Sequence, residues 1–430
     1  MYEQIIDFLS LSDPNVRTVV LGSILLTSSS AIIGAFTFLR KKALVGDAVA
    51  HSVLPGICLA FMIGGAKDPL ILIPGAFLAG WLSMILIDKI TLHSRIKEDT
   101  AIGMVLSVTF GLGILMLTFI QHSGNANQSG LDHFLFGKAA AMLGSDVIIF
   151  SAIALLMVLT VSFLFKEFAL VCFDREYASS MGLPVKRLDF LMTSLTVLAV
   201  VIGIQAVGVV LMAAMLITPA AAARFWTDNL KLMIIMAAVI GAVSGFTGAL
   251  VSYLYPSMPT GPWIVVVASV FAFISFFFAP KKGILQYMIK QRRIRLMINE
   301  ENIIKAGYHI GEDRKDFTSS MTATDLIRRR PMPESKLKGH LAKLTRQGYF
   351  RKHSQGWELT NAGYKKGSRL VRIHRLWELY LTEYLNIASD HVHEDAETIE
   401  HFITPELEKQ LEQTLNYPSE DPHQSKIPYE

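Results

Sequence analysis

Nine apolar stretches, each close to the length that crosses a lipid bilayer, constrain the fold of this chain more than any other feature. They occupy about residues 16–39, 43–64, 69–87, 101–120, 146–165, 188–204, 206–223, 230–255 and 261–279. The sixth and seventh follow one another directly and contain Gly203, Gly208 and Pro219, so they form either two spans or one broken helix with a re-entrant piece. The sequence therefore predicts an all-α polytopic membrane domain of eight or nine transmembrane helices.

Charged residues divide the 430-residue chain into three regions. Residues 1–280 have a net charge of 0, residues 281–375 of +15, and residues 376–430 of −11. We expect a transmembrane domain over 1–280 and a basic juxtamembrane linker over 281–300. A winged helix-turn-helix domain over 301–370 and a helical metal-binding and dimerisation domain over 371–430 should follow. The mixture of basic and apolar residues in the linker is typical of a helix that lies on anionic lipid.

Lysine and arginine residues cluster at alternate ends of the apolar stretches, and such residues face the cytoplasm. With nine crossings this pattern alternates without conflict, places the amino terminus outside the cell, and makes everything after residue 279 cytoplasmic. The sequence thus predicts a multi-pass protein of the inner (cytoplasmic) membrane with a cytoplasmic C-terminal part. The residues concerned are Arg40, Lys41, Lys42, Lys89, Arg95, Lys97, Arg175, Lys186, Arg187, Arg224, Lys231, Lys281 and Lys282.

An acid and an imidazole, Asp47 and His51, lie four residues apart inside the second apolar stretch. This spacing puts both side chains on one face of a helix. Ionisable groups at membrane depth are costly and usually functional, and an oxygen with an imidazole suits Mn²⁺, Fe²⁺ or Zn²⁺. The pair is therefore a candidate transport site for a divalent metal, and the alternative is a buried ion pair that only fixes helix packing.

The polar loop at residues 173–187 is helix-prone up to Met181 and is then turned by Gly182 and Pro184. This pattern predicts a short surface helix that is available to bind a partner. An ordinary solvated connection is the alternative.

Three motifs in order resemble the permease subunit of manganese/zinc/iron ABC importers, over roughly residues 10–280. They are Gly46-Asp47 with His51 and Leu54-Pro55-Gly56, the loop from Asp174 to Gly182, and the segment from Ala206 to Ala221 with Pro219. The resemblance implies that Asp47 and His51 bind the transported metal. It also implies that the loop, with Asp174, Glu176 and Gly182, docks on an ATPase subunit. A second permease copy, as a homo- or heterodimer, and an extracytoplasmic metal-binding protein are the other implied partners.

No Gly-x-x-x-x-Gly-Lys-Ser/Thr phosphate loop occurs in this sequence. We therefore expect a transport subunit that is not an enzyme and binds no nucleotide, with ATP hydrolysed by a separate chain.

Two helices with a turn at Pro331 and Pro333 are predicted over residues 321–330 and 334–348, followed by a hairpin over 349–360. Helix, turn, helix and a basic hairpin make a winged helix-turn-helix, whose second helix can enter a DNA major groove. A solvated charged face or a protein-binding surface is the alternative. The candidate contacts to operator DNA are Ser335, Lys336, Lys338, His340 and Lys343.

The predicted long helix over residues 361–386 carries His374 and Glu378, again four residues apart. A second predicted helical face carries four more candidates, and six nitrogen and oxygen ligands without sulfur suit Mn²⁺ or Fe²⁺. Exposed helix charges are the alternative. The second face consists of His393, Glu397, Glu400 and His401.

Residues 320–430 also resemble the diphtheria-toxin-repressor-like family of iron- and manganese-dependent regulators. The match is carried by the segments 372–378 and 392–401 and by the later Asn416-Tyr-Pro. In that family Glu397 stands where iron-type members often have cysteine, which implies Mn²⁺ as the cofactor. In that family the first helix also supplies ligands. Here Glu300 or Glu301 can supply one, but Ile304, which cannot bind a metal, lies where a second is expected.

The leading hypothesis is the membrane permease of an ATP-driven importer of Mn²⁺, or of Fe²⁺ or Zn²⁺, fused to a metal-responsive repressor of its own pathway. One alternative is an importer whose C-terminal domain senses metal and gates transport without touching DNA. The other is a membrane-held transcription factor whose permease half no longer transports, and the intact Asp47 and His51 argue against it.

Overall fold

The computed structural model describes residues 2–65, 68–122, 137, 142, 144–255, 258–354, 356–385, 387 and 399–429. The chain forms two compact units, Met1–Tyr287 and Met288–Glu430. Within the described residues both units are helical, apart from one two-stranded hairpin in the second.

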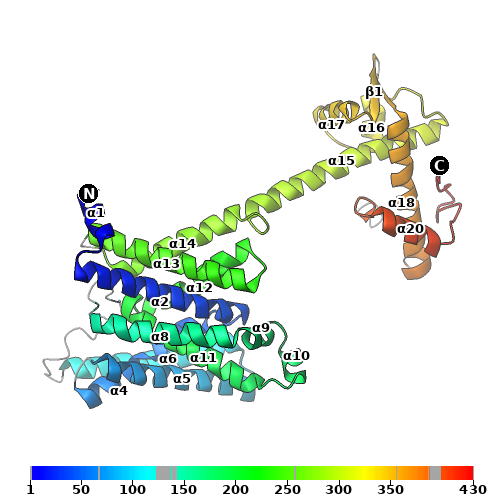
Figure 1. Ribbon diagram of the computed structural model, residues 1–430. Helices are drawn as coiled ribbons and strands as arrows, with labels where there is room; N and C mark the ends of the chain where they lie inside the picture. The colour runs from blue at the N-terminus through cyan, green and yellow to red at the C-terminus, as the bar shows by residue number, and fades with distance from the viewer. Residues whose placement is uncertain are drawn as a thin grey trace. The chain divides into compact units, whose positions relative to one another are not determined.

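The first unit is a bundle of helices around α2, which packs against α8, α11, α12 and α13 (Figure 1). The bundle begins with α1 (Tyr2–Ser10), α2 (Pro14–Leu39), α3 (Val45–Ser52), α4 (Leu54–Gly64), α5 (Pro69–His93) and α6 (Glu98–His122). It continues with α8 (Gly144–Phe163), α9 (Phe165–Phe173), α10 (Arg175–Ser180), α11 (Val185–Val207), α12 (Val209–Trp226), α13 (Leu230–Leu254) and α14 (Thr260–Phe278).

Nine candidate membrane spans occur in the described part of the chain, with α3 and α4 together forming one of them. All nine coincide with the predicted apolar stretches. The sixth and seventh are separate helices, α11 and α12, joined at Gly208, whose φ of +87° a residue with a side chain rarely adopts. Of the two predicted arrangements, the structure therefore supports nine spans.

Glycines let the helices of the first unit approach closely, and two of these contacts are the tightest. A Cβ atom added to Gly34 of α2 would lie 1.8 Å from the carbonyl oxygen of Leu216 in α12. One added to Gly56 of α4 would lie 2.2 Å from the carbonyl oxygen of Gly75 in α5. In lipid there is no hydrophobic driving force between helices, so transmembrane helices associate through close packing. Small residues at the contact make that close packing possible. The first contact holds α2 against α12, and the second holds α4 of the second span against α5.

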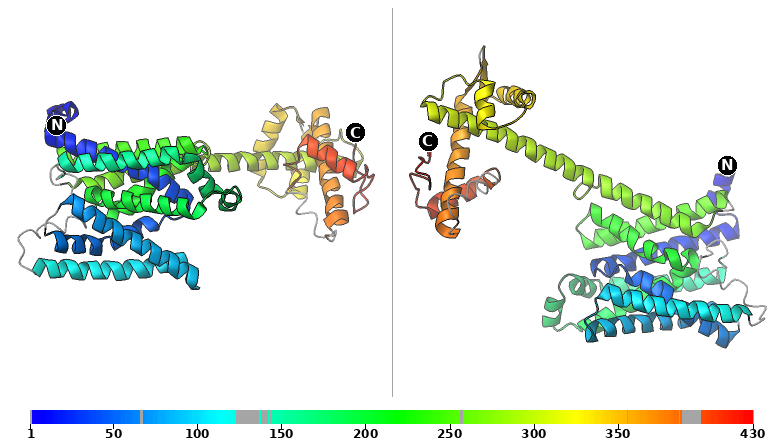
Figure 2. Two further views of the ribbon diagram at one scale, coloured as in Figure 1. Left: turned by 60° about the horizontal axis from the view of Figure 1, so that its bottom comes forward. Right: turned by 180° about the vertical axis from the view of Figure 1, so that it is seen from behind.

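The second unit contains all but the first turn of α15 (Ile284–Arg314). It continues with α16 (Ala323–Arg329), α17 (Glu334–Arg346), β1 (Phe350–His353), β2 (Gly356–Leu359), α18 (Asn361–Leu385) and α20 (Pro405–Thr414). The predicted pair of helices with a proline turn, the hairpin and the long helix are all present. β1 and β2 pair antiparallel, with Arg351 opposite Glu358. α18 then runs from the hairpin to α20, as Figure 2 shows.

The core of the second unit joins α15 to the elements that follow it. Ile303 and Ile304 of α15 are each 1% exposed and pack with Leu337, Leu341 and Phe350. The basic segment predicted as a linker is thus the first half of a continuous helix, α15, whose second half is part of this core.

Candidate functional site

Asp47 and His51 lie one turn apart on α3, as their spacing predicts. Nε2 of His51 is 3.6 Å from Oδ1 of Asp47, which is too long for a hydrogen bond. The Asp47 side chain is 41% exposed and the His51 side chain 19%. Two donors that are close but not bonded to each other can both face one cation, because metal bonds of about 2.0–2.2 Å separate adjacent ligands by roughly this distance.

Packing, and not hydrogen bonding, fixes the His51 ring. The ring meets Phe110 of α6 edge to face, with centroids 4.9 Å apart at 88°. Its Nδ1 atom is buried and has no hydrogen-bonding partner among the described residues. Leaving a buried polar nitrogen unpaired costs free energy. Nδ1 of His51 is such an atom, and it keeps an unused capacity to donate or accept.

The backbone around the pair explains the two residues that flank it in the motif. A Cβ atom on Gly46 would lie 3.0 Å from the Leu216 side chain of α12, so a larger residue would require that side chain to shift. Pro55 has no N–H group to donate to the carbonyl of His51, and α3 ends at Ser52. Gly46 and Pro55 therefore set where Asp47 and His51 stand.

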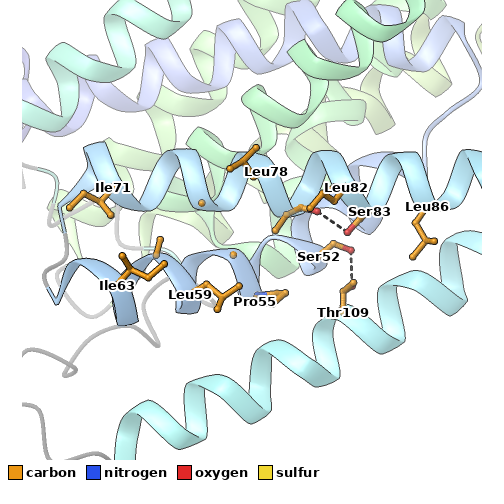
Figure 3. A pocket seen from close by; sticks show the side chains of 14 residues that line it. Ser52, Pro55, Leu59, Ile63, Ile71, Leu78, Leu82, Ser83, Leu86 and Thr109 are labelled. Carbon is orange, nitrogen blue, oxygen red and sulfur yellow. Dashed lines mark hydrogen bonds between the residues drawn. The ribbon is translucent and has the colours of Figure 1, made fainter.

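An apolar groove of about 550 Å³ lies between α4, α5 and α6, beginning at Ser52 (Figure 3). Its hydroxyl groups are already engaged: Ser52 and Thr109 share a hydrogen bond of 2.8 Å, and Ser83 donates to the carbonyl of Ala79 at 2.9 Å. The lining contains no carboxylate, imidazole or thiol, and neither Asp47 nor His51 belongs to it. The groove is thus distinct from the candidate metal pair.

The predicted surface helix is α10, which ends at Ser180 and lies at the end of the bundle opposite the amino terminus (Figure 1). Asp174 caps it by accepting a hydrogen bond of 2.9 Å from the backbone N–H of Tyr177. Glu176 is exposed, and Gly182 has a φ of +79° with open space around it. Asp174 therefore shapes the helix, whereas Glu176 faces outward.

A polar cavity of about 600 Å³ adjoins α10. Arg175 of α10 forms an ion pair with Asp189 of α11, which also binds Arg40 at 3.2 Å. Exposed apolar side chains stand beside these charges, with Tyr177 at 52% and Met181 at 61%. An exposed helix with apolar tips next to a charged cavity is suited to receiving a partner protein.

In the second unit, four of the six predicted regulatory ligands come together. His374 lies at the centre: its Nε2 is 3.1 Å from Oε1 of Glu378, and its Nδ1 is 2.6 Å from Oε2 of Glu400. His401 follows directly, with Nε2 3.5 Å from Oε1 of Glu400. The other two predicted ligands, His393 and Glu397, lie outside the described residues.

A lysine that sequence reasoning missed lies inside this cluster. Nζ of Lys305 donates to Glu400 at 2.7 and 3.0 Å and lies 3.1 Å from Nδ1 of His374. Ile304, the position where a further ligand was expected, is buried in the core instead. The signal was available, because Glu301 and Lys305 are four residues apart on one helix and must share a face.

Glu301, and not Glu300, faces the predicted ligands. Its Oε2 atom is 2.7 Å from Nδ1 of His401, and its Oε1 atom is 2.9 Å from Lys366. The Oδ1 atom of Asn302 is 3.1 Å from Nε2 of His401. Both nitrogens of His401 are therefore engaged with α15.

Burial and hydrogen bonding act in opposite directions on this cluster. Burial lowers the pKa of His374, but hydrogen bonds to Glu378 and Glu400 outweigh it and leave that pKa above its ordinary value. Burial raises the pKa of Glu400, but His374 and Lys305 together hold it below its ordinary value. Among the described residues, no three or more His, Cys, Asp or Glu side chains are arranged to hold a metal ion.

The five predicted DNA contacts on α17 divide into two groups. Ser335, Lys336 and Lys338 are exposed, while Leu337, Leu341 and Leu344 on the other face are buried. Lys343 forms an ion pair of 2.6 Å with Glu300, and His340 lies 3.8 Å from the same carboxylate. The Lys343 side chain is nevertheless 48% exposed, so it is open to a partner together with the start of α17, whereas His340 is only 13% exposed beside α15.

Comparison with known proteins gives two family matches. Residues 12–279 match the ABC 3 transport family, and residues 360–429 match the iron dependent repressor, metal binding and dimerisation domain. The manganese transport system membrane protein MntC of Bacillus subtilis is 41% identical over 394 residues, 91% of this chain and 89% of that protein. That length exceeds residues 12–279, so the similarity extends into the second unit.

Two further relatives match the first unit. The zinc transport system membrane protein TroC of Treponema pallidum is 40% identical over 67% of this chain and 97% of its own. The solved structure of PsaBC from Streptococcus pneumoniae in complex with Fab includes a chain that is 33% identical, with a TM-score of 0.60. It covers 67% of this chain and 99% of that one.

Proposed function

Because the chain belongs to the ABC 3 transport family, we propose that it is the permease of an ATP-driven importer of divalent transition metal, with Mn²⁺ as the first candidate substrate and Fe²⁺ or Zn²⁺ as others. Family membership makes it a multi-pass membrane subunit and not a catalytic one. Two of its relatives are described as manganese and zinc transport proteins, and this supports a metal substrate here.

The separation of Asp47 and His51 is the single observation that carries this proposal. Both side chains lie on α3, within 3.6 Å but without a hydrogen bond, and Nδ1 of His51 is unpaired among the described residues. Two protein donors leave other coordination positions to water or to a second permease copy. Such incomplete coordination suits a transport substrate, which must be bound and then released.

The proposed partners follow from the two ends of the membrane unit. An ATPase subunit docks on α10 and the adjoining charged cavity, where Asp174 shapes the helix and Glu176 and Gly182 complete the surface. An extracytoplasmic metal-binding protein delivers the metal at the other end. The distribution of lysine and arginine supports a protein of the inner membrane whose α10 and second unit face the cytoplasm.

For the second unit we propose a metal-responsive regulator of the same pathway. α16, α17 and the hairpin form its winged helix-turn-helix, and Ser335, Lys336 and Lys338 contact operator DNA. His374, Glu378, Glu400 and His401, with His393 and Glu397, provide nitrogen and oxygen donors of the kind that Mn²⁺ or Fe²⁺ takes. Such an ion would supply the positive charge that holds these acids together. The match to a metal-binding and dimerisation domain supports this role.

Uptake of radiolabelled Mn²⁺ tests the transport function, in a transport-null host that also expresses the ATPase and the binding protein. Asp47→Ala should abolish uptake while the protein still inserts into the membrane, because it removes a ligand without changing the length of a span. Asp99→Ala, which removes an exposed acid at the start of α6, is the matched control and should transport normally. Normal uptake by Asp47→Ala would remove this pair from the mechanism.

DNA binding decides between the regulator and the alternative, an importer whose second unit gates transport without DNA. The full chain in nanodiscs should retard DNA from upstream of its own operon only with Mn²⁺ present, at a salt concentration that suppresses non-specific phosphate contacts. Lys336→Glu should abolish the shift, and Lys409→Glu, an exposed change on α20, should not. Absence of any shift would favour the gating alternative.

A further inference from the structure

Lys305 is an unusually placed lysine. It is 8% exposed, and lysine is rarely buried at all unless a partner neutralises it. Its partner is Glu400, whose side chain is fully buried and receives hydrogen bonds from the Lys305 ammonium on both oxygens. A buried ion pair of this kind needs every charge compensated, and here the ammonium compensates Glu400.

The ammonium also lies among the donors that a metal would use. It is 3.1 Å from Nδ1 of His374, and that ring nitrogen is in turn 2.6 Å from Glu400. Oxygen and nitrogen donors of this type are those that a divalent metal takes, although with the ammonium among them the described side chains are not arranged to hold one. A divalent ion bound to Glu400 would, however, be in close contact with the Lys305 ammonium, and like charges repel strongly in a buried environment.

We propose that Lys305 is a tethered cation of this cluster: its ammonium takes the position of the metal between Glu400 and His374, and a divalent ion binds there only by displacing it. The inference rests on the proposed role of the second unit as a metal-binding module. Lys305 compensates the buried Glu400 carboxylate when metal is scarce. It also raises the metal concentration at which the unit responds, because the ion must compete with a charge attached to α15.

The test measures Mn²⁺ binding to the full chain in detergent. Every sample carries Asp47→Ala, so that the transport pair does not contribute. Lys305→Met should lower the Kd for Mn²⁺ at the second unit by at least about tenfold. Lys290→Met removes the same charge from an exposed position on the same helix and should leave the Kd unchanged.

Two outcomes of this titration overturn the proposal: equal Kd values for Lys305→Met and the parent chain, or no Mn²⁺ bound by either. A parent chain that binds no Mn²⁺ beside a Lys305→Met variant that does supports the tethered cation and rejects metal-dependent regulation. Equal, tight binding by both chains rejects the tethered cation and supports metal-dependent regulation. The failure of the inference and the failure of the proposed function can thus be told apart.

If Lys305→Met does not fold, amine labelling of the unmutated lysine replaces it. Reductive methylation followed by mass spectrometry reports whether each ammonium is accessible. Lys305 should be protected in EDTA and should react several-fold faster at saturating Mn²⁺, while Lys290 reacts equally in both. Protection of Lys305 that persists at the highest Mn²⁺ concentration would overturn the proposal.

Discussion

The two units each contain an acid and a histidine four residues apart on a helix, and the two pairs differ in their surroundings. In the first unit, His51 stands 3.6 Å from Asp47, and its other nitrogen has no partner in the described structure. In the second, His374 is 3.1 Å from Glu378 and its other nitrogen contacts Glu400 and Lys305. The same spacing thus gives one pair with unused capacity and one pair already compensated.

This difference indicates what helical spacing does and does not specify. Spacing places two side chains on one face, but the neighbouring helices decide whether their donors are free. Phe110 packs against His51 without offering it a hydrogen bond, whereas α15 brings a cation to His374. A transport site needs donors that bind and release the metal readily. A regulatory site needs to bind the metal only above a threshold concentration.

Exchanging the two histidines for alanine gives the largest contrast between the units. His51→Ala should reduce Mn²⁺ uptake by about 100-fold or more, because it removes one of two protein donors from the transported ion. His374→Ala should leave the initial uptake rate nearly unchanged in the same host. His93→Ala, at an exposed position at the end of α5, controls for loss of a histidine from the membrane unit. A large transport defect in His374→Ala would mean that the two sites act together.

Glu400→Ala should destabilise the second unit by about 3–5 kcal/mol, because it leaves the Lys305 ammonium buried without a counterion. Hydrogen exchange of the amides of α18 in the full chain measures this effect without contributions from the membrane unit. Adding Lys305→Met to Glu400→Ala should recover much of the loss. Glu383→Ala, an exposed change on α18, is the control. Unchanged protection in Glu400→Ala would show that the pair contributes little.

Gly182→Val should lower uptake by roughly tenfold while leaving Asp47 and His51 intact, since a residue with a Cβ atom is strained at φ of +79° by about 1–2 kcal/mol. Co-purification of the ATPase with the variant measures the cause directly. Gly65→Val imposes a similar strain at φ of +64° at the end of α4 and should still co-purify the ATPase. Full co-purification with Gly182→Val would make the loop a simple connection.

The smallest effect concerns Glu312, at the end of α15. Burial raises its pKa, but hydrogen bonds from His309 and Arg375 outweigh this and lower it from 4.5 to about 2. Because the folded-state pKa is depressed, the carboxylate stabilises the second unit above its unfolded pKa and loses that contribution as the pH falls towards 2. Glu312→Gln should cost about 1 kcal/mol at pH 7, since the group is partly exposed, and the difference should vanish in acid.

The pH dependence of urea unfolding checks this expectation, with Asp313→Asn as the neighbouring control. A Glu312→Gln variant whose deficit persists in acid would point to lost packing and not to lost charge.

Hydrophobic length and turn residues were enough to predict most of the fold. The nine spans follow from apolar stretches, and the turn at Pro331 and Pro333 follows from proline stereochemistry. Local sequence is sufficient in these cases because the forces that fix each element act within it. The separation of α11 and α12 remained open, because it depends on the φ of Gly208, which the sequence permits but does not impose.

The candidate sites were predicted less completely. Proximity of His374 and Glu378 followed from helical spacing, and that of Glu400 from the expected packing of a second ligand-bearing segment. Lys305 comes from a helix about 70 residues earlier, and only tertiary packing brings it there. Similarly, Glu300 of α15 pairs with Lys343, an expected DNA contact whose side chain stays 48% exposed, and no local pattern predicted this ion pair. Each miss involves a charge contributed by α15, whose register against the later helices no local pattern specifies.

Leu216 is a mechanical link between three helices of the membrane unit. Gly34 of α2 touches its backbone and Gly46 of α3 approaches its side chain, so α2, α3 and α12 cannot slide past one another without opening a packed contact. Asp47, next to Gly46, therefore belongs to a rigid body. If Asp47 is a ligand of the transported metal, as proposed, we expect the alternation of access to come from helices outside this contact, such as α6 with Phe110, moving by shear.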